Sequence, residues 1–212
     1  MDADRYYTEL AAAFVRGKIP ALARGTDDEV IALGLREGLR LHKFKQQAEL
    51  PRVRRVLGIL RGLGPESLLD VGSGRGTFLW PVLAAFPELP VLAIDLSEQR
   101  AKDLDAVRAG GVTRLRAEQM DARRMSLGDG SVDVVTMLEV LEHMPEPDRA
   151  AAEALRVARR FVLASVPSHE DDNPEHIHLF DPATLTRMFV SHGAAKVTCE
   201  HVLNHIVAVV RR

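Results

Sequence analysis

The stretch that decides the fold is LLDVGSGRGTF, residues 68–78. It begins as a short apolar strand pattern, continues through Gly72, Gly74 and Gly76, and runs into a helical pattern of apolar residues. Glycine lets the chain turn sharply and lets a ligand approach the backbone closely. A glycine triplet alone also occurs in plain tight turns, but this position between a strand and a helix favours a nucleotide-binding loop.

From residue 67 onward, short apolar runs alternate with helical patterns. The expected strands cover residues 67–71, 91–95, 112–117, 132–138 and 161–166, and two more strands in the tail meet at residues 203–204. Helices are expected from about residue 78, over 97–109, over 147–159 and from Pro182 to Gly193. Because parallel strands need crossover helices, this alternation predicts an α/β fold with a doubly wound, seven-stranded, mostly parallel sheet.

Ligands bind such sheets outside the carboxyl ends of the strands. The functional residues are therefore expected to follow Val71, Ile94, Leu115, Leu138 and Val166. The first 65 residues read as helices, which predicts an N-terminal helical cap over residues 1–65 and an α/β domain over residues 66–212.

Two helices of this cap have sequence signals. Thr26 and Glu29 form a capping box at one helix start, and Leu35 and Leu39 are expected one helical turn apart on that helix. Pro51 opens the other helix. Its expected apolar stripe consists of Val53, Val56, Leu57 and Leu60.

Composition excludes several functional classes. The chain has 212 residues, 46% hydrophobic and 27% charged, as in an ordinary soluble protein. No apolar run approaches the roughly 18 residues of a membrane helix, and the N-terminal sequence lacks a secretory pattern, so we expect a cytoplasmic protein with no membrane partner. The single cysteine, Cys199, excludes an internal disulfide and a cysteine-rich zinc site. A net charge of −2 with 1 Trp, 2 Tyr and 7 Phe disfavours a base-stacking platform.

Two acids accompany the glycine loop. Asp95 follows Gly76 by 19 residues and ends a strand, which suits a carboxylate that binds ribose hydroxyls, although an acid there can also cap a helix. The glycine spacing is G-x-G-x-G, whereas dinucleotide dehydrogenases show G-x-G-x-x-G. Asp70 would repel a pyrophosphate but suits the positively charged methionine end of S-adenosylmethionine.

Four segments resemble, in order and spacing, the motifs of class I S-adenosylmethionine-dependent methyltransferases: LLDVGSGRG, AIDLS, MDARRM and DVVTMLEVLEHMPEP. The resemblance covers about residues 67–212. It implies a Rossmann-like methyltransferase fold, with residues 66–212 as the S-adenosylmethionine-binding domain, but does not specify the methyl acceptor. A nicotinamide-dependent oxidoreductase and a binding protein that retains the cofactor site without catalysis are the alternatives.

The resemblance also implies a set of cofactor-binding residues. They are Asp70, Gly72, Gly74, Gly76, Asp95, Leu96, Asp121, Ala122, Leu138 and Glu139. By the resemblance, Asp95 would hold the ribose and Leu96 would pack on the adenine. Asp121 would accept a hydrogen bond from the adenine amino group, with the backbone N–H of Ala122 beside it. Alternatively, Asp121 is only an acidic residue in a turn. Leu138 and Glu139 would lie nearest the reacting sulfonium.

A cluster of acids and histidines follows the fourth expected strand. Glu139, Glu142 and His143 fall at i, i+3 and i+4, so one helical turn would point all three to the same side. A histidine pair, His176 and His178, lies beyond the fifth strand, and an acidic loop before it carries a further histidine, His169.

Three interpretations of this cluster stay open. The segment resembles the metal site of 2′-O-methyltransferases acting on the 3′ ends of small RNAs, which implies Mg²⁺ or Mn²⁺ on Glu139, Glu142, His143 and His178. It differs from them in the gap of only 35 residues between His143 and His178 and in lacking their arginine-rich stretch. Alternatively, His143 or His178 is a metal-free catalytic base beside Glu139, the reading we prefer, or the cluster is structural only.

A basic segment lies within the expected cap. Its cations between residues 39 and 63, against the single acid Glu49, are Arg40, Lys43, Lys45, Arg52, Arg54, Arg55 and Arg61. A solvated helix face is the simple interpretation, and a phosphate-bearing acceptor, small or as large as RNA, is the alternative. The stretch LRLHKFKQ, with Tyr6 and Tyr7, is also a candidate lid over the acceptor.

We therefore expect a methyl transferase that acts on a small-molecule acceptor. Oxygen is the preferred nucleophile, because a base or a metal helps a hydroxyl and is less needed for an amine or a thiol. Metal-dependent 2′-O-methylation of RNA 3′ ends and N-methylation of a small metabolite remain the alternatives.

Overall fold

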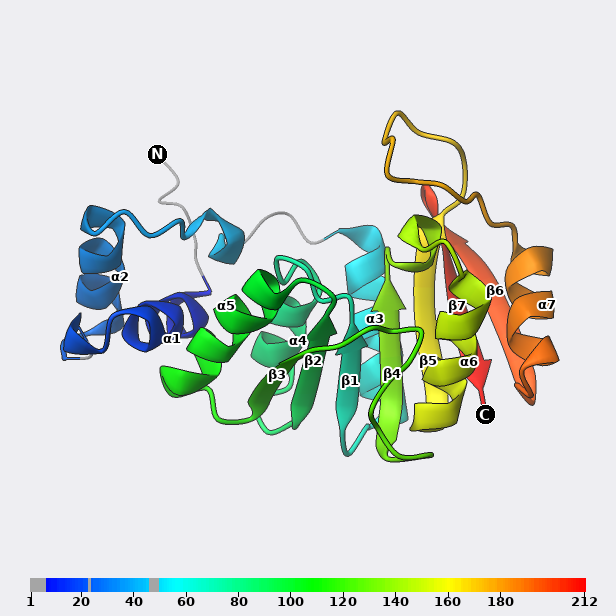
Figure 1. Cartoon of the computed structure of the whole chain (residues 1–212), viewed down its shortest axis with the longest axis horizontal. Coiled ribbons are helices and arrows are strands. Elements are labelled where there is room, and N and C mark those ends of the chain that lie inside the picture. Colours follow the sequence, from blue (N-terminus) through cyan, green and yellow to red (C-terminus); the bar gives the residue numbers. More distant parts are fainter. Residues whose placement is uncertain (1–6, 23, 46–49) are drawn as a thin grey trace.

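The computed structural model describes residues 7–22, 24–45 and 50–212. Its centre is a seven-stranded sheet in the order β3-β2-β1-β4-β5-β7-β6 (Figure 1). The strands are β1 (Leu68–Val71), β2 (Val91–Asp95), β3 (Leu115–Gln119), β4 (Val132–Leu138), β5 (Ala158–Pro167), β6 (Lys196–Val202) and β7 (His205–Arg211). Neighbouring strands run parallel except at β7, which is antiparallel to β5 and β6. The expected mostly parallel α/β sheet is confirmed.

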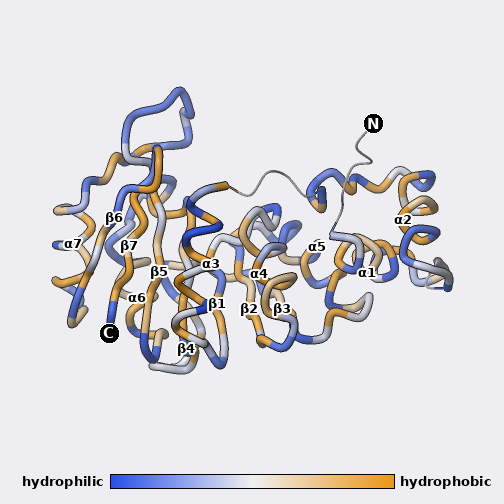
Figure 2. Tube along the Cα trace, turned by 180° about the vertical axis from the view of Figure 1, so that it is seen from behind, coloured by the Kyte–Doolittle hydropathy of each residue, from blue (hydrophilic) through white to orange (hydrophobic). Residues whose placement is uncertain are grey.

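Helices cover both faces of the sheet (Figure 1). They are α1 (Thr8–Lys18), α2 (Asp27–Arg36), α3 (Pro51–Leu63), α4 (Leu79–Ala85), α5 (Glu98–Ala109), α6 (Pro147–Val157) and α7 (Pro182–Ser191). Side chains of α1 and α3–α5 share one apolar core with the sheet face of Leu68, and those of α6 and α7 share another with the face of Leu69. Figure 2 shows the strands as mostly hydrophobic. The carboxyl ends of the parallel strands lie along the upper edge in Figure 1.

Several expected element boundaries were wrong, among them the start of the fifth strand, which is Ala158 and not residue 161. The third strand begins at Leu115, because Gly111, with φ of 124°, lies in the turn that precedes it. Its carboxyl end is therefore Gln119, and Leu115 does not face the ligand edge. The helix expected to reach residue 159 ends at Val157, because Ala158 already pairs with β4 in the sheet.

The N-terminal helices α1 and α2 lie at the β3 end of the molecule, with α1 beside α5 and α2 beyond α1 (Figure 1). The backbones of α1 and α5 touch: a Cβ on Gly110 would lie 1.7 Å from the carbonyl oxygen of Ala13, and one on Gly17 would lie 1.9 Å from that of Ala106. Only glycine permits this approach, so two glycines far apart in the sequence fix the position of α1.

The helix signals of this region are largely confirmed. Thr26 and Glu29 form the capping box that begins α2. The helix ends at Arg36 and Gly38 has φ of 80°, so Leu39 has left the helix, contrary to the expectation that it stacks on Leu35. The stripe expected on α3 is fully buried and consists of Val53, Val56, Leu57 and Leu60.

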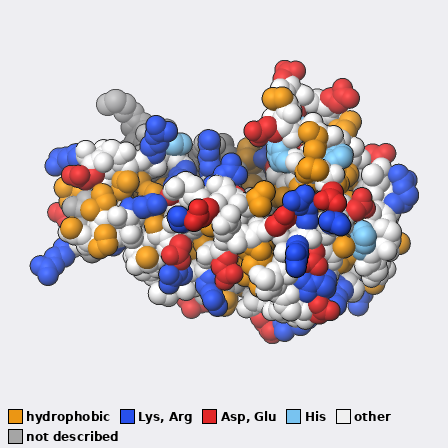
Figure 3. Space-filling view, viewed as in Figure 1, with side chains coloured by type: hydrophobic (Ala, Val, Ile, Leu, Met, Phe, Trp, Pro, Cys, Tyr) orange, Lys and Arg blue, Asp and Glu red, His pale blue; other side chains and the backbone are white. Residues whose placement is uncertain are grey.

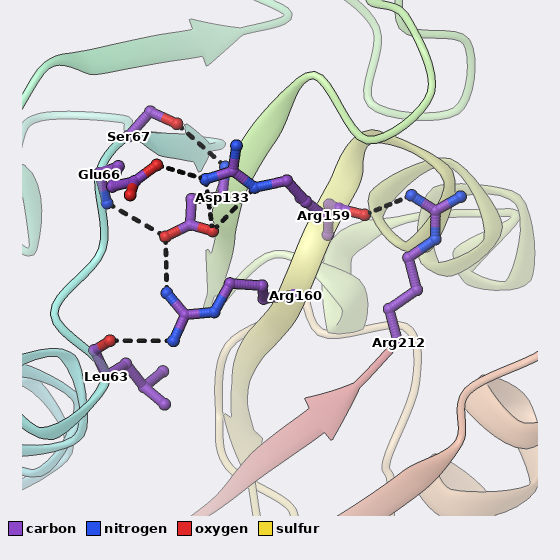
Figure 4. A network of polar contacts seen from close by, with 8 residues as sticks. Leu63, Glu66, Ser67, Asp133, Arg159, Arg160 and Arg212 are labelled. Carbon is purple, nitrogen blue, oxygen red and sulfur yellow. Dashed lines mark hydrogen bonds and ion pairs between the residues drawn. The ribbon is translucent and has the colours of Figure 1, made fainter.

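A polar network closes the edge of the sheet opposite the carboxyl ends (Figure 4). The Asp133 side chain is 0% exposed and accepts hydrogen bonds from Arg160 at 2.8 Å, from Arg159 at 3.1 Å and from the backbone N–H of Glu66 at 3.1 Å. Burial acts to raise the pKa of the Asp133 carboxyl, but these donors outweigh burial and hold the pKa below its ordinary value. The network ties the entry of β1 to β4 and β5.

We expect Asp133→Ala to lower the free energy of unfolding by about 2–3 kcal/mol, the scale of hydrogen bonds to a charged group. Urea unfolding at neutral pH measures the change. Asp129→Ala is the control, because Asp129 also pairs with an arginine, Arg156, but is exposed, and should cost less than about 1 kcal/mol. Equal losses in both variants would contradict a role for the buried network.

Candidate functional site

The three glycines of the loop after β1 differ in what surrounds them. All have positive φ: 68° at Gly72, 56° at Gly74 and 86° at Gly76. A Cβ on Gly72 would lie 2.7 Å from Val140, and one on Gly76 would lie 2.0 Å from the ring of Trp80. A Cβ on Gly74 would meet nothing closer than 3.6 Å. Gly72 and Gly76 are thus fixed by packing, whereas Gly74 faces open space where a ligand can approach.

Asp70 is buried in β1 beside this loop. Its Oδ1 accepts a hydrogen bond from the Thr136 hydroxyl at 2.8 Å, while Oδ2 has no hydrogen-bond partner within the described residues. Burial raises the pKa of the Asp70 carboxyl to about 6. Asp70, Gly72, Gly74, Leu138 and Glu139 line a common cavity of 170 Å³. A cationic group in this cavity would meet an acid that lacks a full set of partners.

Asp95 holds the tip of the glycine loop against β2. Its Oδ2 accepts from the backbone N–H of Gly74 at 2.9 Å, and its Oδ1 accepts from that of Ser97 at 2.8 Å. Ser97 itself caps α5, so Asp95 is not the capping residue. The next residue, Leu96, is exposed and offers an apolar surface at the same edge.

Asp121 lies just beyond the carboxyl end of β3. Both of its oxygens receive hydrogen bonds from Arg123, whose side chain also contacts Glu146. The Arg123 side chain lowers the pKa of the Asp121 carboxyl. The neighbouring Ala122 is buried.

Glu139 does not share a helical turn with Glu142 and His143, contrary to expectation. Its φ is 58°, and the 3-10 turn η3 begins only at Leu141 (Leu141–His143). The left-handed conformation turns the side chain away from η3 toward β5 and β7. There it accepts from the hydroxyl of Ser165 at 2.8 Å.

Two further residues contact Glu139: His205, which like Ser165 was not foreseen from the sequence, and Arg52, which was expected only as a member of the basic segment. Glu139 Oε2 lies 3.0 Å from Nε2 of His205, and the Arg52 guanidinium lies 3.5 Å from Oε1. Burial lowers the pKa of His205, Glu139 acts to raise it, and Arg52 lowers it further. The turn expected between the two tail strands puts His205 at the start of the last strand. What brings His205 to this site is the pairing of that strand with β5, in which His205 lies opposite Pro167.

Three of the remaining members of the acid–histidine cluster form a group of their own. One oxygen of Glu142 and one ring nitrogen each of His143 and His176 lie within 4.8 Å of one another. His178 is not part of this trio, although its backbone N–H donates to the Glu142 carbonyl oxygen. Figure 3 shows histidine and acidic side chains gathered over the upper part of this end of the molecule.

The structure therefore changes the ligand set expected for a metal. Glu139 contacts Ser165 and His205 because of its left-handed backbone, so it is not one of the trio, although its charge still acts on Glu142. His176 takes the place expected for His178. Burial raises the pKa of the Glu142 carboxyl to about 8, and the neighbouring Glu139 charge raises it in the same direction.

Comparison with known proteins identifies the family of the chain. A family model described as a methyltransferase domain matches residues 69–160. A malonyl-[acyl-carrier protein] O-methyltransferase of Geobacter sulfurreducens is 30% identical over 145 residues, which cover 68% of this chain and 50% of that protein. The chain belongs to the class I S-adenosylmethionine-dependent methyltransferase superfamily.

Two other members of this superfamily show the extent of the likeness. The malonyl-[acyl-carrier protein] O-methyltransferase of Methylococcus capsulatus is 34% identical over 49% of this chain and 38% of that protein. A SAM-dependent methyltransferase structure from Aquifex aeolicus has a TM-score of 0.59 at 20% identity, and the match covers 76% of this chain and 97% of that one. The chain spans half or less of the length of the two curated relatives.

The basic segment of this methyltransferase-superfamily chain is partly neutralised. Lys43 pairs with Asp103 at 2.8 Å, Arg52 pairs with Glu139, and Arg55 pairs with Glu200. Glu49 and Tyr6 lie outside the described residues. A cavity of 610 Å³ separates the N-terminal region from the glycine loop, and Arg40 and Arg75 are among its lining cations. Within the described residues, no helix is long and apolar enough to span a bilayer.

Proposed function

We propose that this chain binds S-adenosylmethionine at the glycine loop and promotes methyl transfer to an oxygen nucleophile. The observation that carries the proposal is the buried Asp70 oxygen, which has no hydrogen-bond partner in the part of the chain that the structure describes, beside the open side of Gly74. The methionine moiety has an ammonium group that fits both features, because it is small and positively charged. A pyrophosphate would place negative charge against Asp70 and would be repelled.

The proposed cofactor contacts follow the edge of the sheet. Asp70, Gly72 and Gly74 would hold the methionine moiety, while Gly76 keeps the loop packed on Trp80. Asp95 would accept hydrogen bonds from the ribose, and Leu96 would cover the adenine. Asp121, held by Arg123, and the N–H of Ala122 would meet the adenine amino edge. Leu138 and Glu139 would flank the sulfonium, which when bound supplies an electrophilic methyl group.

We propose His205 as the general base, in place of His143 and His178. The support is its contact with Glu139, which lines the same cavity as Asp70 and Gly74. If Nε2–H donates to Glu139, Nδ1 is left to take the proton of an acceptor hydroxyl, and the carboxylate stabilises the imidazolium that forms. Because its pKa is lowered, His205 is unprotonated at neutral pH and can accept a proton. His143 instead contacts the carbonyl oxygen of Glu175.

Oxygen is the proposed acceptor atom because a base of this kind serves a hydroxyl, and because both curated relatives named above are O-methyltransferases. A labelled-methyl transfer screen over phenols, sugars, small acids, amines and RNA tests this. Transfer to a hydroxyl compound is expected, and transfer confined to amines would contradict it. Calorimetry with S-adenosylhomocysteine and NADH separates the cofactor assignment from the acceptor, since only the first should bind.

Asp70 gives the cofactor proposal a pH test. Its pKa of about 6 lies above the ordinary value of 3.8, so its contribution to stability is present below pH 3.8 and is lost as the pH rises through 6. Asp70→Asn is therefore expected to raise the free energy of unfolding at pH 7.5, by up to about 3 kcal/mol. The same variant should weaken S-adenosylmethionine binding at that pH, because the ammonium loses its counter-charge.

Urea unfolding and calorimetry from pH 5 to 8 measure both effects. In the native chain, affinity for S-adenosylmethionine should fall below pH 6 as Asp70 takes up a proton, and in Asp70→Asn this dependence should flatten. Asp103→Asn is the control, since Asp103 is a carboxylate paired with two lysines and has no place in the proposed cofactor contacts. Unchanged cofactor affinity in Asp70→Asn would place the ammonium elsewhere.

A further inference from the structure

Glu142 is a carboxylate in η3 that is 0% exposed. Within the described residues, neither of its oxygens has a hydrogen-bond partner. An ionised carboxylate buried without a partner costs several kcal/mol, so such a group is retained with either a proton or a cation. The surroundings of Glu142 decide between these two.

Two imidazoles face this carboxylate. One ring nitrogen of His143 and one of His176 lie within 4.8 Å of each other and of a Glu142 oxygen. The two rings lie 4.8 Å apart between centroids. They come from different segments, η3 and the loop of residues 168–180 after β5, so this arrangement is not a consequence of neighbouring positions in the sequence.

Each imidazole is oriented by a polar contact outside the trio. His143 Nδ1 lies 3.0 Å from the carbonyl oxygen of Glu175, and His176 Nδ1 lies 2.8 Å from Oδ1 of Asp171. A neutral imidazole that donates from Nδ1 presents the lone pair of Nε2, and metal-binding histidines are typically fixed by an outer carbonyl or carboxylate in this way. Both rings are thus prepared as ligands.

The same loop is held to Glu142 through the backbone. The N–H groups of Ile177 and His178 donate to the Glu142 carbonyl oxygen at 2.9 and 3.2 Å. His178 Nε2 is a further buried nitrogen without a hydrogen-bond partner within the described residues. Within the described residues no donor reaches the Glu142 oxygens, whereas two imidazoles face them, which favours a cation.

We propose that Glu142, His143 and His176 bind a divalent cation of the zinc class, which fastens the loop of residues 168–180 to η3. Two imidazoles and one carboxylate suit Zn²⁺ and similar transition metals, whereas Mg²⁺ prefers an oxygen shell with several waters. Neither Glu139 nor His205 is among its ligands, and its existence does not depend on the proposed methyl transfer.

Calorimetry with Zn²⁺ and with Mg²⁺ tests the site on untagged, chelator-treated protein. We expect one Zn²⁺ per chain and no measurable Mg²⁺ binding. Glu142→Gln and His176→Ala should each weaken Zn²⁺ by at least about tenfold, the scale seen even for outer partners of metal ligands. His169→Ala is the matched control, because His169 lies on the same loop but contacts Ser168, and its Zn²⁺ affinity should equal that of the native chain.

A second readout follows the loop itself. Zn²⁺ should slow proteolytic cleavage within residues 168–176 in the native chain and in His169→Ala, but not in Glu142→Gln, with circular dichroism confirming that each variant is folded. Absence of Zn²⁺ binding to the native chain would overturn the proposal and leave Glu142 as a protonated acid. Native affinity retained in Glu142→Gln and His176→Ala would overturn it equally, because the metal would then lie elsewhere.

Discussion

Glu139→Gln is expected to lower the rate of methyl transfer by about 10²–10⁴-fold, the usual worth of general acid–base catalysis. The carboxylate contacts His205 at 3.0 Å, and an amide in its place cannot stabilise an imidazolium. Single-turnover rates with labelled S-adenosylmethionine measure the loss. Affinity for S-adenosylhomocysteine should change by less than about tenfold, because the backbone and Asp70 contacts to the methionine moiety remain.

His205→Ala and the double variant complete this test. If the two residues act as a unit, each single change and the double change should cost nearly the same factor. In the native chain the rate should rise with pH and reach half its maximum below pH 6.5, because burial lowers the pKa of His205. Glu200→Gln is the control, as Glu200 also pairs with an arginine of α3. Full activity in Glu139→Gln would exclude the pair as the base.

The periodic elements were predictable because each one is encoded locally. Buried strands such as residues 132–138 are continuous apolar runs, and helix starts such as Ser97 carry a side chain that caps the backbone. The third strand was misplaced because LRAEQ alternates weakly and lies at the sheet edge, where burial of β3 is slight. The docking of α1 was not predictable, since the contact of Gly110 with Ala13 joins two helices whose sequences show ordinary glycines.

Site residues that directly follow a strand could be predicted from the sequence, whereas residues whose positions depend on loop conformation could not. The spacing of Glu139, Glu142 and His143 indicated one helical turn, but a left-handed residue at Glu139 divides the group into two. No periodic pattern distinguishes His176 from His178 in an irregular loop. His205 reaches Glu139 through the antiparallel pairing of β7 with β5, a contact between residues 66 positions apart.

Gly74→Val is expected to weaken S-adenosylhomocysteine binding by at least about a hundredfold, or about 2.8 kcal/mol. Gly72 and Gly76 are confined by Val140 and Trp80, so substitutions there would disturb the loop itself. At Gly74 the added side chain meets open space, and its effect falls on whatever occupies that space. Calorimetry with S-adenosylhomocysteine measures the loss, and NADH should remain without measurable binding.

Backbone strain is the competing explanation, and Gly64 separates it from a steric block. Gly64 has φ of 55°, against 56° at Gly74, and a Cβ there would meet nothing within 4 Å, against a nearest atom at 3.6 Å for Gly74. Valine imposes a similar left-handed strain at both positions, so the two variants should lose similar amounts of stability in urea. Only Gly74→Val should lose the ligand, because Gly64 ends α3 away from the glycine loop. Equal affinity in the two variants would remove Gly74 from the cofactor site and, with it, the main geometric support for S-adenosylmethionine at this loop.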